Sequence, residues 1–121
     1  MQKFIALVKR RADFSAEAFR DYYETRHVPL AKGLIGEYFA DYRRNYPSVV
    51  TALESADPGA TPADAYDCVT EIWFEDDAFE RMQAMLAEHP DRAKQIQDDE
   101  AKFMDRSMVR LMVCNEQRGF A

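Results

Sequence analysis

The sequence predicts an α+β fold in which four β-strands form one antiparallel sheet and two helical regions pack against it. Three observations support this. Four short apolar runs are typical of strands, two longer segments carry apolar residues at helical spacing, and the order is β-α-β-β-α-β. The chain has 121 residues, of which 47% are hydrophobic and 31% charged. This length fits a single domain over residues 1–121 that has a hydrophobic core of its own.

The first two elements are expected over residues 3–9 and 15–32. The run 3–9 is apolar between charged ends, which is typical of a strand that is buried on both faces and therefore central in its sheet. Ser15 is a good N-cap for the helix, because its hydroxyl can accept a hydrogen bond from a free backbone N–H. Phe14 and Phe19 have the spacing of a hydrophobic staple, which supports the same helix start.

Pro29 is expected to disturb this first helix. A proline has no backbone N–H and disfavours helical geometry in the residue before it, so we expect a kink or a pause over residues 27–29. The carbonyl of Thr25, four residues back, then loses its helical partner. Gly33 and Gly36 are expected to end the element.

Residues 37–46 and 65–74 are predicted to form the second and third strands, with a long loop over 47–64 between them. The second strand is rich in tyrosine, and its alternation places Tyr42 on the opposite face from Asn45. The loop contains prolines, glycine and small polar residues, and loops of this length are usually functional or mobile. The third strand is rich in β-branched and aromatic residues.

The rest of the chain predicts a second helical region and a last strand. Asp77 and Glu80 have the spacing of a capping box, and an apolar stripe follows them. The His-Pro pair at 89–90 breaks the region, and a second helical stretch runs to about residue 103. Residues 107–114 are expected to form the last strand.

This element order is that of the ferredoxin-like fold, an antiparallel four-stranded sheet that carries its helices on one face. The other face has no helix to cover it, although the first strand is apolar on both faces. A second copy of the same sheet would cover that face, so the sequence predicts a homodimer.

The composition restricts the possible partners. Lys and Arg number 16 and Asp and Glu number 22, which gives a net charge of −6 and argues against nucleic-acid binding. The longest apolar run, residues 4–8, is too short to cross a bilayer, so no membrane partner is expected. Cys68 and Cys114 form no C-x-x-C pair and are expected to stay reduced, as in a cytoplasmic protein. The sequence contains no glycine-rich phosphate loop and no metal-ligand motif, so we expect neither cofactor nor metal.

His27 is the first candidate for chemistry, because an imidazole titrates near neutral pH and can both accept and donate a proton. It stands beside the Pro29 interruption, where irregular backbone can open space. The alternative is a structural histidine that hydrogen-bonds a nearby carbonyl. Tyr23 lies one helical turn earlier on the same face. Its phenol could orient the imidazole or bind a substrate oxygen, or the ring could simply pack in the core with Phe19.

The predicted third strand supplies further candidates, because Asp67, Glu71 and Trp73 share a face by alternation. A buried carboxylate tends to have a raised pKa and can serve as an acid or a base. Trp73 either walls an apolar pocket or fills the core. The alternative for the acids is an ion pair with an arginine of a neighbouring strand: Arg43, Arg44 or Arg110.

Several motifs spread over nearly the whole chain carry a family likeness. The most specific is His27-x-Pro29-Leu30-Ala31 in its helix context. The others are Lys3-Phe4-Ile5-Ala6-Leu7, Ser15-x-x-x-Phe19-x-x-Tyr22-Tyr23, Tyr42-x-x-Asn45, Tyr66-Asp67, Glu71-Ile72-Trp73-Phe74 and Phe103-Met104-Asp105. Together they resemble the EthD family. The resemblance implies a dimeric α+β barrel built from two ferredoxin-like subunits, although the 47–64 loop looks longer than the usual connection of that family.

The wider relatives of that family include cofactor-free decarboxylases, cyclases, isomerases, dehydratases and monooxygenases that act on small aromatic or polyketide-like molecules. The resemblance therefore implies a cofactor-independent enzyme in which His27 moves a proton. Tyr23 or Glu71 would assist it, and the substrate would contact Trp73, Asn45, Phe19 and Tyr42. The alternatives are a non-catalytic protein that carries a hydrophobic metabolite, and a cofactor-free monooxygenase.

Overall fold

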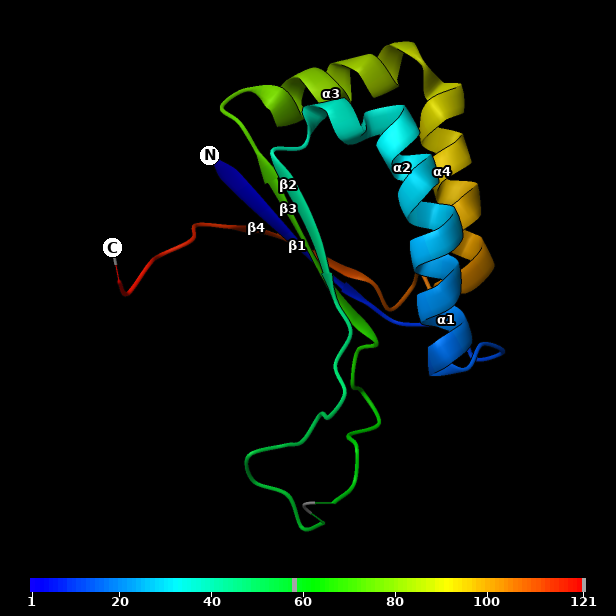
Figure 1. Ribbon diagram of the computed structural model, residues 1–121, viewed down its shortest axis with the longest axis vertical. Helices are drawn as coiled ribbons and strands as arrows, with labels where there is room; N and C mark the ends of the chain where they lie inside the picture. The colour runs from blue at the N-terminus through cyan, green and yellow to red at the C-terminus, as the bar shows by residue number, and fades with distance from the viewer. Residues whose placement is uncertain (58, 121) are drawn as a thin grey trace.

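A computed structural model of the chain describes residues 1–57 and 59–120, so position 58 of the expected loop and position 121 lie outside the described part. Within it, four strands form one antiparallel sheet and the helices lie on one face of that sheet (Figure 1). In spatial order the strands are β2 (Asp41–Asn45), β3 (Cys68–Phe74), β1 (Gln2–Val8) and β4 (Arg110–Cys114). The predicted ferredoxin-like α+β class and the central place of the first strand are confirmed.

The strand register divides the sheet into a helix face and an open face. Ala6 of β1 lies opposite Thr70 of β3 and Leu111 of β4, and all three point toward the helices. The next residue back, Ile5, lies opposite Glu71 and Met112, and these point to the open face. Residues directly opposite in an antiparallel pair share a face, so this one register fixes the face of every strand residue.

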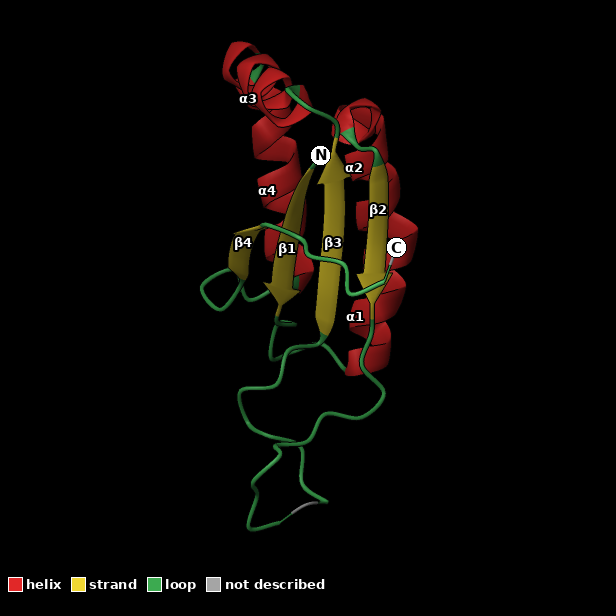
Figure 2. Ribbon diagram, turned by 90° about the vertical axis from the view of Figure 1, so that its left-hand side faces the viewer, coloured by secondary structure: helices red, strands yellow, loops and turns green. Residues whose placement is uncertain are grey.

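The helices form a layer against one side of the sheet. The first helical segment comprises α1 (Ala16–Tyr22), the π-helix η1 (Tyr23–His27) and α2 (Val28–Ile35), which follow one another as a continuous rod (Figure 1). Beside it runs α4 (Pro90–Phe103), and α3 (Ala78–Glu88) crosses the end of the sheet (Figures 1 and 2). The main buried cluster between the layers consists of Val8, Phe19, Tyr23, Val28, Cys68, Phe103 and Met104.

Ser15 caps the first helix as predicted, since its Oγ accepts a hydrogen bond of 3.0 Å from the Ala18 N–H. The helix then continues past Gly33 to Ile35 instead of ending near residue 32. The expected kink at 27–29 is also replaced by the π-helix, in which the N–H of Val28 bonds the carbonyl of Tyr23. The wider turn inserts one residue, so that Pro29 falls in the first turn of α2, where a missing N–H costs little.

Three other predicted boundaries are wrong, and the first is that of β3, which begins at Cys68 and not at residue 65. Residues Gly36–Tyr38 form a 3₁₀ turn, so β2 begins at Asp41 and not at residue 37. The aromatic side chains before β2 belong to the core and not to a strand, because Tyr38 and Phe39 pack against the buried cluster around Phe74. β4 begins at Arg110 and not at residue 107.

Asp77 does not cap α3 as a capping box would require. No side-chain cap bond from Asp77 is found in the described part of the chain, and its Oδ1 instead accepts a hydrogen bond of 3.1 Å from Arg81. A cation four residues later therefore competes successfully with the backbone N–H groups for this carboxylate.

Candidate active site

A cavity of about 270 Å³ lies between the helix layer and the helix face of the sheet. This volume is close to the lower end of the roughly 300–1,000 Å³ that small-molecule sites occupy. Its walls are mostly aliphatic and aromatic, with a few polar groups among them. The lining residues are Ala6, Val8, Tyr23, His27, Ala31, Ile35, Phe39, Tyr42, Thr70, Ile72, Ile96, Glu100, Met104, Arg106, Val109 and Leu111.

His27 is the most distinctive polar group of the cavity wall. It is the last residue of the π-helix and only 4% exposed. Its Nδ1 lies 2.9 Å from Oδ2 of Asp99 on α4, and Oδ1 of the same carboxylate accepts a hydrogen bond of 2.7 Å from the Tyr22 hydroxyl. Because a carboxylate only accepts hydrogen bonds, the shared proton belongs to Nδ1. The lone pair is then on Nε2, for which no partner is present among the described residues.

Aromatic rings hold this imidazole in place. The ring of Tyr23 stands nearly edge-on to it, with centroids 5.5 Å apart, and the ring of Phe103 lies 5.2 Å away on α4. With Asp99 bound to Nδ1, these contacts leave the imidazole little freedom to rotate. A histidine with one nitrogen fixed by a carboxylate and the other facing a cavity is the arrangement of a positioned general base.

Three hydroxyl groups lie in the same cavity. The phenol oxygen of Tyr23 is 2.6 Å from Oγ1 of Thr70, and both side chains are 3% exposed. Burial raises the pKa of Tyr23 well above its usual value of 10.0 and that of Tyr42 to about 12. Both phenols therefore stay protonated and can donate hydrogen bonds to a substrate oxygen.

The cavity also contains a carboxylate, Glu100, one residue after Asp99 on α4. Burial among apolar neighbours raises its pKa above 4.5, an effect that the nearby His27 and Arg106 side chains partly oppose. The Nε of Arg106 lies 3.4 Å from Oε1 of Glu100. Asp99 and Glu100 are thus neighbours on one turn of α4 whose side chains point in different directions. Asp99 contacts Nδ1 of the imidazole, whereas Glu100 lines the cavity.

A model of the EthD domain matches residues 11–107 of the chain, a region that contains every polar residue of the cavity. The chain belongs to the EthD family. The comparison with curated proteins found no significant similarity to the chain.

Solved structures resemble this EthD domain over their whole length. An EthD family protein from Bacillus halodurans has a TM-score of 0.61 and 19% identity, with 97% of this chain and 100% of that chain covered. An EthD-like protein from Ralstonia eutropha has a TM-score of 0.61 and 18% identity, with 98% and 96% covered. HapK from Hahella chejuensis has a TM-score of 0.57 and 17% identity, with 100% and 96% covered. At these identities the likeness shows the fold.

Of the residues predicted from sequence, the EthD domain brings His27, Tyr23 and Tyr42 together in the cavity. Tyr23 does not hydrogen-bond the imidazole, because its hydroxyl is turned to Thr70 and the orienting group is Asp99. Phe19 is fully buried in the core behind the cavity, where its ring packs against Tyr23 and Phe103.

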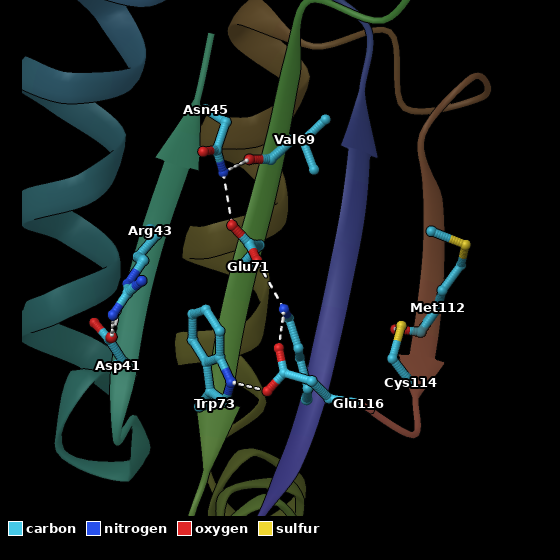
Figure 3. Close-up of polar contacts among 10 residues, drawn as sticks. Asp41, Arg43, Asn45, Val69, Glu71, Trp73, Met112, Cys114 and Glu116 are labelled. Carbon is cyan, nitrogen blue, oxygen red and sulfur yellow. Dashed lines mark hydrogen bonds and ion pairs between the residues drawn. The ribbon is translucent and has the colours of Figure 1, made fainter. Parts of the chain in front are cut away.

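The predicted grouping of Glu71, Trp73 and Asn45 with His27 is corrected by the structure, because all three lie on the open face (Figure 3). Alternation along β3 turns Thr70 and Ile72 toward the helices and Glu71 and Trp73 away. Glu71 forms an ion pair of 2.8 Å with Lys3 and accepts a hydrogen bond of 2.8 Å from Asn45. The indole Nε1 of Trp73 donates a bond of 3.1 Å to Glu116.

The expected ion pairing of the strand acids occurs, but with other partners. Lys3 pairs with Glu71 and holds its pKa below the usual 4.5. Asp67 lies 3.3 Å from Nε of Arg10. The three arginines that were expected as partners are therefore not the ones that bind these acids.

Three functional candidates were not predicted from sequence: Asp99, Glu100 and Arg106. Asp99 lies four residues before the buried Phe103, so it falls on the inner face of α4, and this spacing was the available signal. Across residues 1–57 and 59–120, no three His, Cys, Asp or Glu side chains gather in a way that could hold a metal ion. In the same part of the chain, no helix has the length and apolar character needed to cross a bilayer.

Proposed function

We propose that this EthD domain is a cofactor-independent enzyme that transfers a proton on a small, largely apolar and oxygenated substrate. The reaction is a dehydration, decarboxylation, cyclisation or isomerisation. The observation that supports this most strongly is the geometry of His27, which lines an apolar cavity and whose Nδ1 is held by the buried Asp99, so that Nε2 is the nitrogen available to a ligand.

In this proposal Nε2 removes a proton from a carbon or hydroxyl of the substrate. The imidazolium that forms is stabilised by the carboxylate of Asp99, 2.9 Å from Nδ1, and the low polarity of the cavity strengthens that attraction. The negative charge that develops on a substrate oxygen is met by a hydroxyl of Tyr23, Thr70 or Tyr42. Nε2 then returns the proton, either to a new carbon or to a departing hydroxyl group.

The second candidate is a binding protein that carries a hydrophobic metabolite without turning it over. The apolar walls favour it, as does the Tyr23 hydroxyl, which already has a partner in Thr70. The two functions are separated by incubation with a panel of hydroxylated aromatic compounds followed by mass spectrometry. Binding with an unchanged mass supports the carrier, whereas a changed mass supports the enzyme.

The test of the catalytic role is the His27→Ala variant. A general base contributes roughly 10²–10⁴-fold to a rate, so we expect turnover to fall at least tenfold. The matched control is His89→Ala, because His89 is exposed between α3 and α4. A His27→Ala variant that keeps full turnover would remove this residue from the mechanism.

We also propose that the open face of the sheet packs against a second copy of the chain. Ile5, Leu7, Val69 and Met112 point to this face, which carries no helix within the described residues. Apolar strand residues of this kind gain stability when a second sheet covers them. The ion pair of Lys3 with Glu71 lies on the same face, where it joins the two central strands β1 and β3 and supplies polar groups.

A further inference from the structure

The residues that line the cavity differ widely in exposure. Tyr23, Thr70 and His27 are between 3% and 4% exposed. By contrast, Leu111 is 76% exposed, and the side chain of Arg106 is 51% exposed. Arg106 is therefore a lining residue that a ligand in the cavity can meet while its guanidinium is still in contact with solvent.

The ion pair that Arg106 forms is a weak one. The shortest distance between Arg106 and Glu100 is 3.4 Å, and the described part of the chain offers the guanidinium no other side-chain partner. By contrast, Arg44 binds both oxygens of Glu24, at 2.7 and 3.0 Å. A guanidinium is a planar fork with five N–H donors, so Arg106 keeps most of its binding capacity unused.

Glu100 is also a poor permanent partner for Arg106. Its carboxyl group lies among apolar residues of the cavity, and burial raises its pKa, so its ionised form is disfavoured there. The attraction that holds the pair is correspondingly small, because part of it is offset by the cost of keeping that charge out of water.

We propose that the substrate is a monocarboxylic acid whose carboxylate displaces Glu100 from Arg106. The apolar body of the acid then fills the cavity, and its reacting end meets His27. A single guanidinium matches one carboxylate, and the neighbouring carboxylates of Glu100 and Asp99 disfavour a ligand with a second negative charge. The inference rests on the proposed function, for which it specifies the class of substrate.

The experiment compares cinnamate with cinnamamide, which share their shape and differ in charge, by calorimetry at pH 7. We expect the wild-type chain to bind cinnamate at least about tenfold more tightly, as for a charged hydrogen bond in a partly buried site. Arg106→Gln should abolish this preference. Glu100→Gln should tighten the binding of cinnamate, because the competing carboxylate is gone, and leave cinnamamide unchanged.

Lys102→Gln is the matched control, since Lys102 is an exposed cation in the last turn of α4 and does not line the cavity. His27→Ala should keep the preference for cinnamate, which separates this inference from the proposed catalysis. Equal affinity for the two probes, binding of neither, or weaker binding of cinnamate by Glu100→Gln would overturn the inference. A preserved preference in a chain without His27-dependent turnover would instead contradict the proposed function.

Discussion

The imidazole of His27 and the carboxylate of Asp99 depend on each other, because each is buried and each is the hydrogen-bond partner of the other. Removal of Asp99 would leave Nδ1 of His27 without its partner, and removal of His27 would leave Oδ2 of Asp99 without its partner, in a place that water does not reach easily. A substitution that keeps the shape but changes the proton pattern is therefore the sharper probe at the residue scale.

Asp99→Asn should keep the fold and reduce turnover by at least about 100-fold, as in catalytic triads where the imidazole is held in the wrong tautomer. The Tyr22 hydroxyl donates to Oδ1 in the wild-type chain, so the amide oxygen takes that place and the amide N–H₂ faces Nδ1 of His27. The proton of the imidazole then moves to Nε2. Nitrogen NMR of His27 reads the tautomer directly.

Asp98→Asn is the control for this variant, because Asp98 is exposed and pairs with Lys94 on the surface of α4. It should leave both the tautomer and the rate unchanged. An Asp99→Asn variant with wild-type turnover would show that the carboxylate does not position the base.

Glu100 gives a prediction about pH and stability. Its folded-state pKa is raised above 4.5 by burial, so the folded chain binds this proton more tightly than the unfolded chain does. The stability that the neutral carboxyl group contributes is complete below the unfolded pKa and is lost as the pH rises through the folded pKa. Glu100→Gln lacks this dependence. The free energy of unfolding of the variant, relative to that of the wild type, should therefore increase as the pH rises. Urea unfolding over a pH series measures the difference, and a difference that is constant with pH would contradict the prediction.

Among the secondary-structure elements, the two predicted N-caps, Ser15 and Asp77, should differ in their contribution to stability. The Ser15 hydroxyl bonds the Ala18 N–H, whereas the Asp77 carboxylate bonds Arg81 instead of the backbone. Ser15→Ala should therefore cost about 1 kcal/mol of unfolding free energy. Asp77→Ala should cost less than about 0.5 kcal/mol, as for an exposed surface position. Thermal or urea unfolding measures the loss of stability in each variant. Equal losses in Ser15→Ala and Asp77→Ala would contradict the prediction.

Local signals in the sequence were sufficient for the start of α1 and for the disturbance at Pro29. They were not sufficient for the form of that disturbance, because the π-turn is selected by the packing of Tyr23 and His27 against α4 as well as by the proline. The predicted cap at Asp77 failed because the spacing of a motif does not reveal which partner a side chain prefers.

The candidate site was predictable only in part, for two physical reasons. Asp99 is 72 residues from His27 in sequence, so nothing local connects them. Alternation along β3 separates Thr70 from Glu71, but it does not say which of them faces the helices, because β1 is apolar on both faces. The sheet face that carries the cavity was therefore assigned wrongly for Glu71, Trp73 and Asn45.

At the scale of the whole molecule, the open face of the sheet predicts a homodimer. The C-terminal segment after β4 crosses part of this face, and the rest has no covering element among the described residues (Figure 2). Light scattering should give about twice the chain mass of 14.0 kDa. Ile5→Glu should shift the mass toward one chain, because a charge would be buried between two sheets.

Leu53→Glu is the control for the dimer, because Leu53 is fully exposed in the loop between β2 and β3, away from that face. This variant should keep the wild-type mass. A wild-type mass near 14.0 kDa would contradict the dimer.

Proton transfer by His27 can be measured as the exchange of a substrate proton with solvent. Aryl ketones with an acidic C–H are incubated with the chain in deuterated water, and mass spectrometry follows the uptake of deuterium. We expect the wild-type chain and His89→Ala to accelerate the exchange of at least one such compound, and we expect the acceleration by His27→Ala to be at least about tenfold smaller. Equal exchange rates with the wild-type chain and with His27→Ala would contradict the claim that Nε2 of His27 is the group that takes the proton.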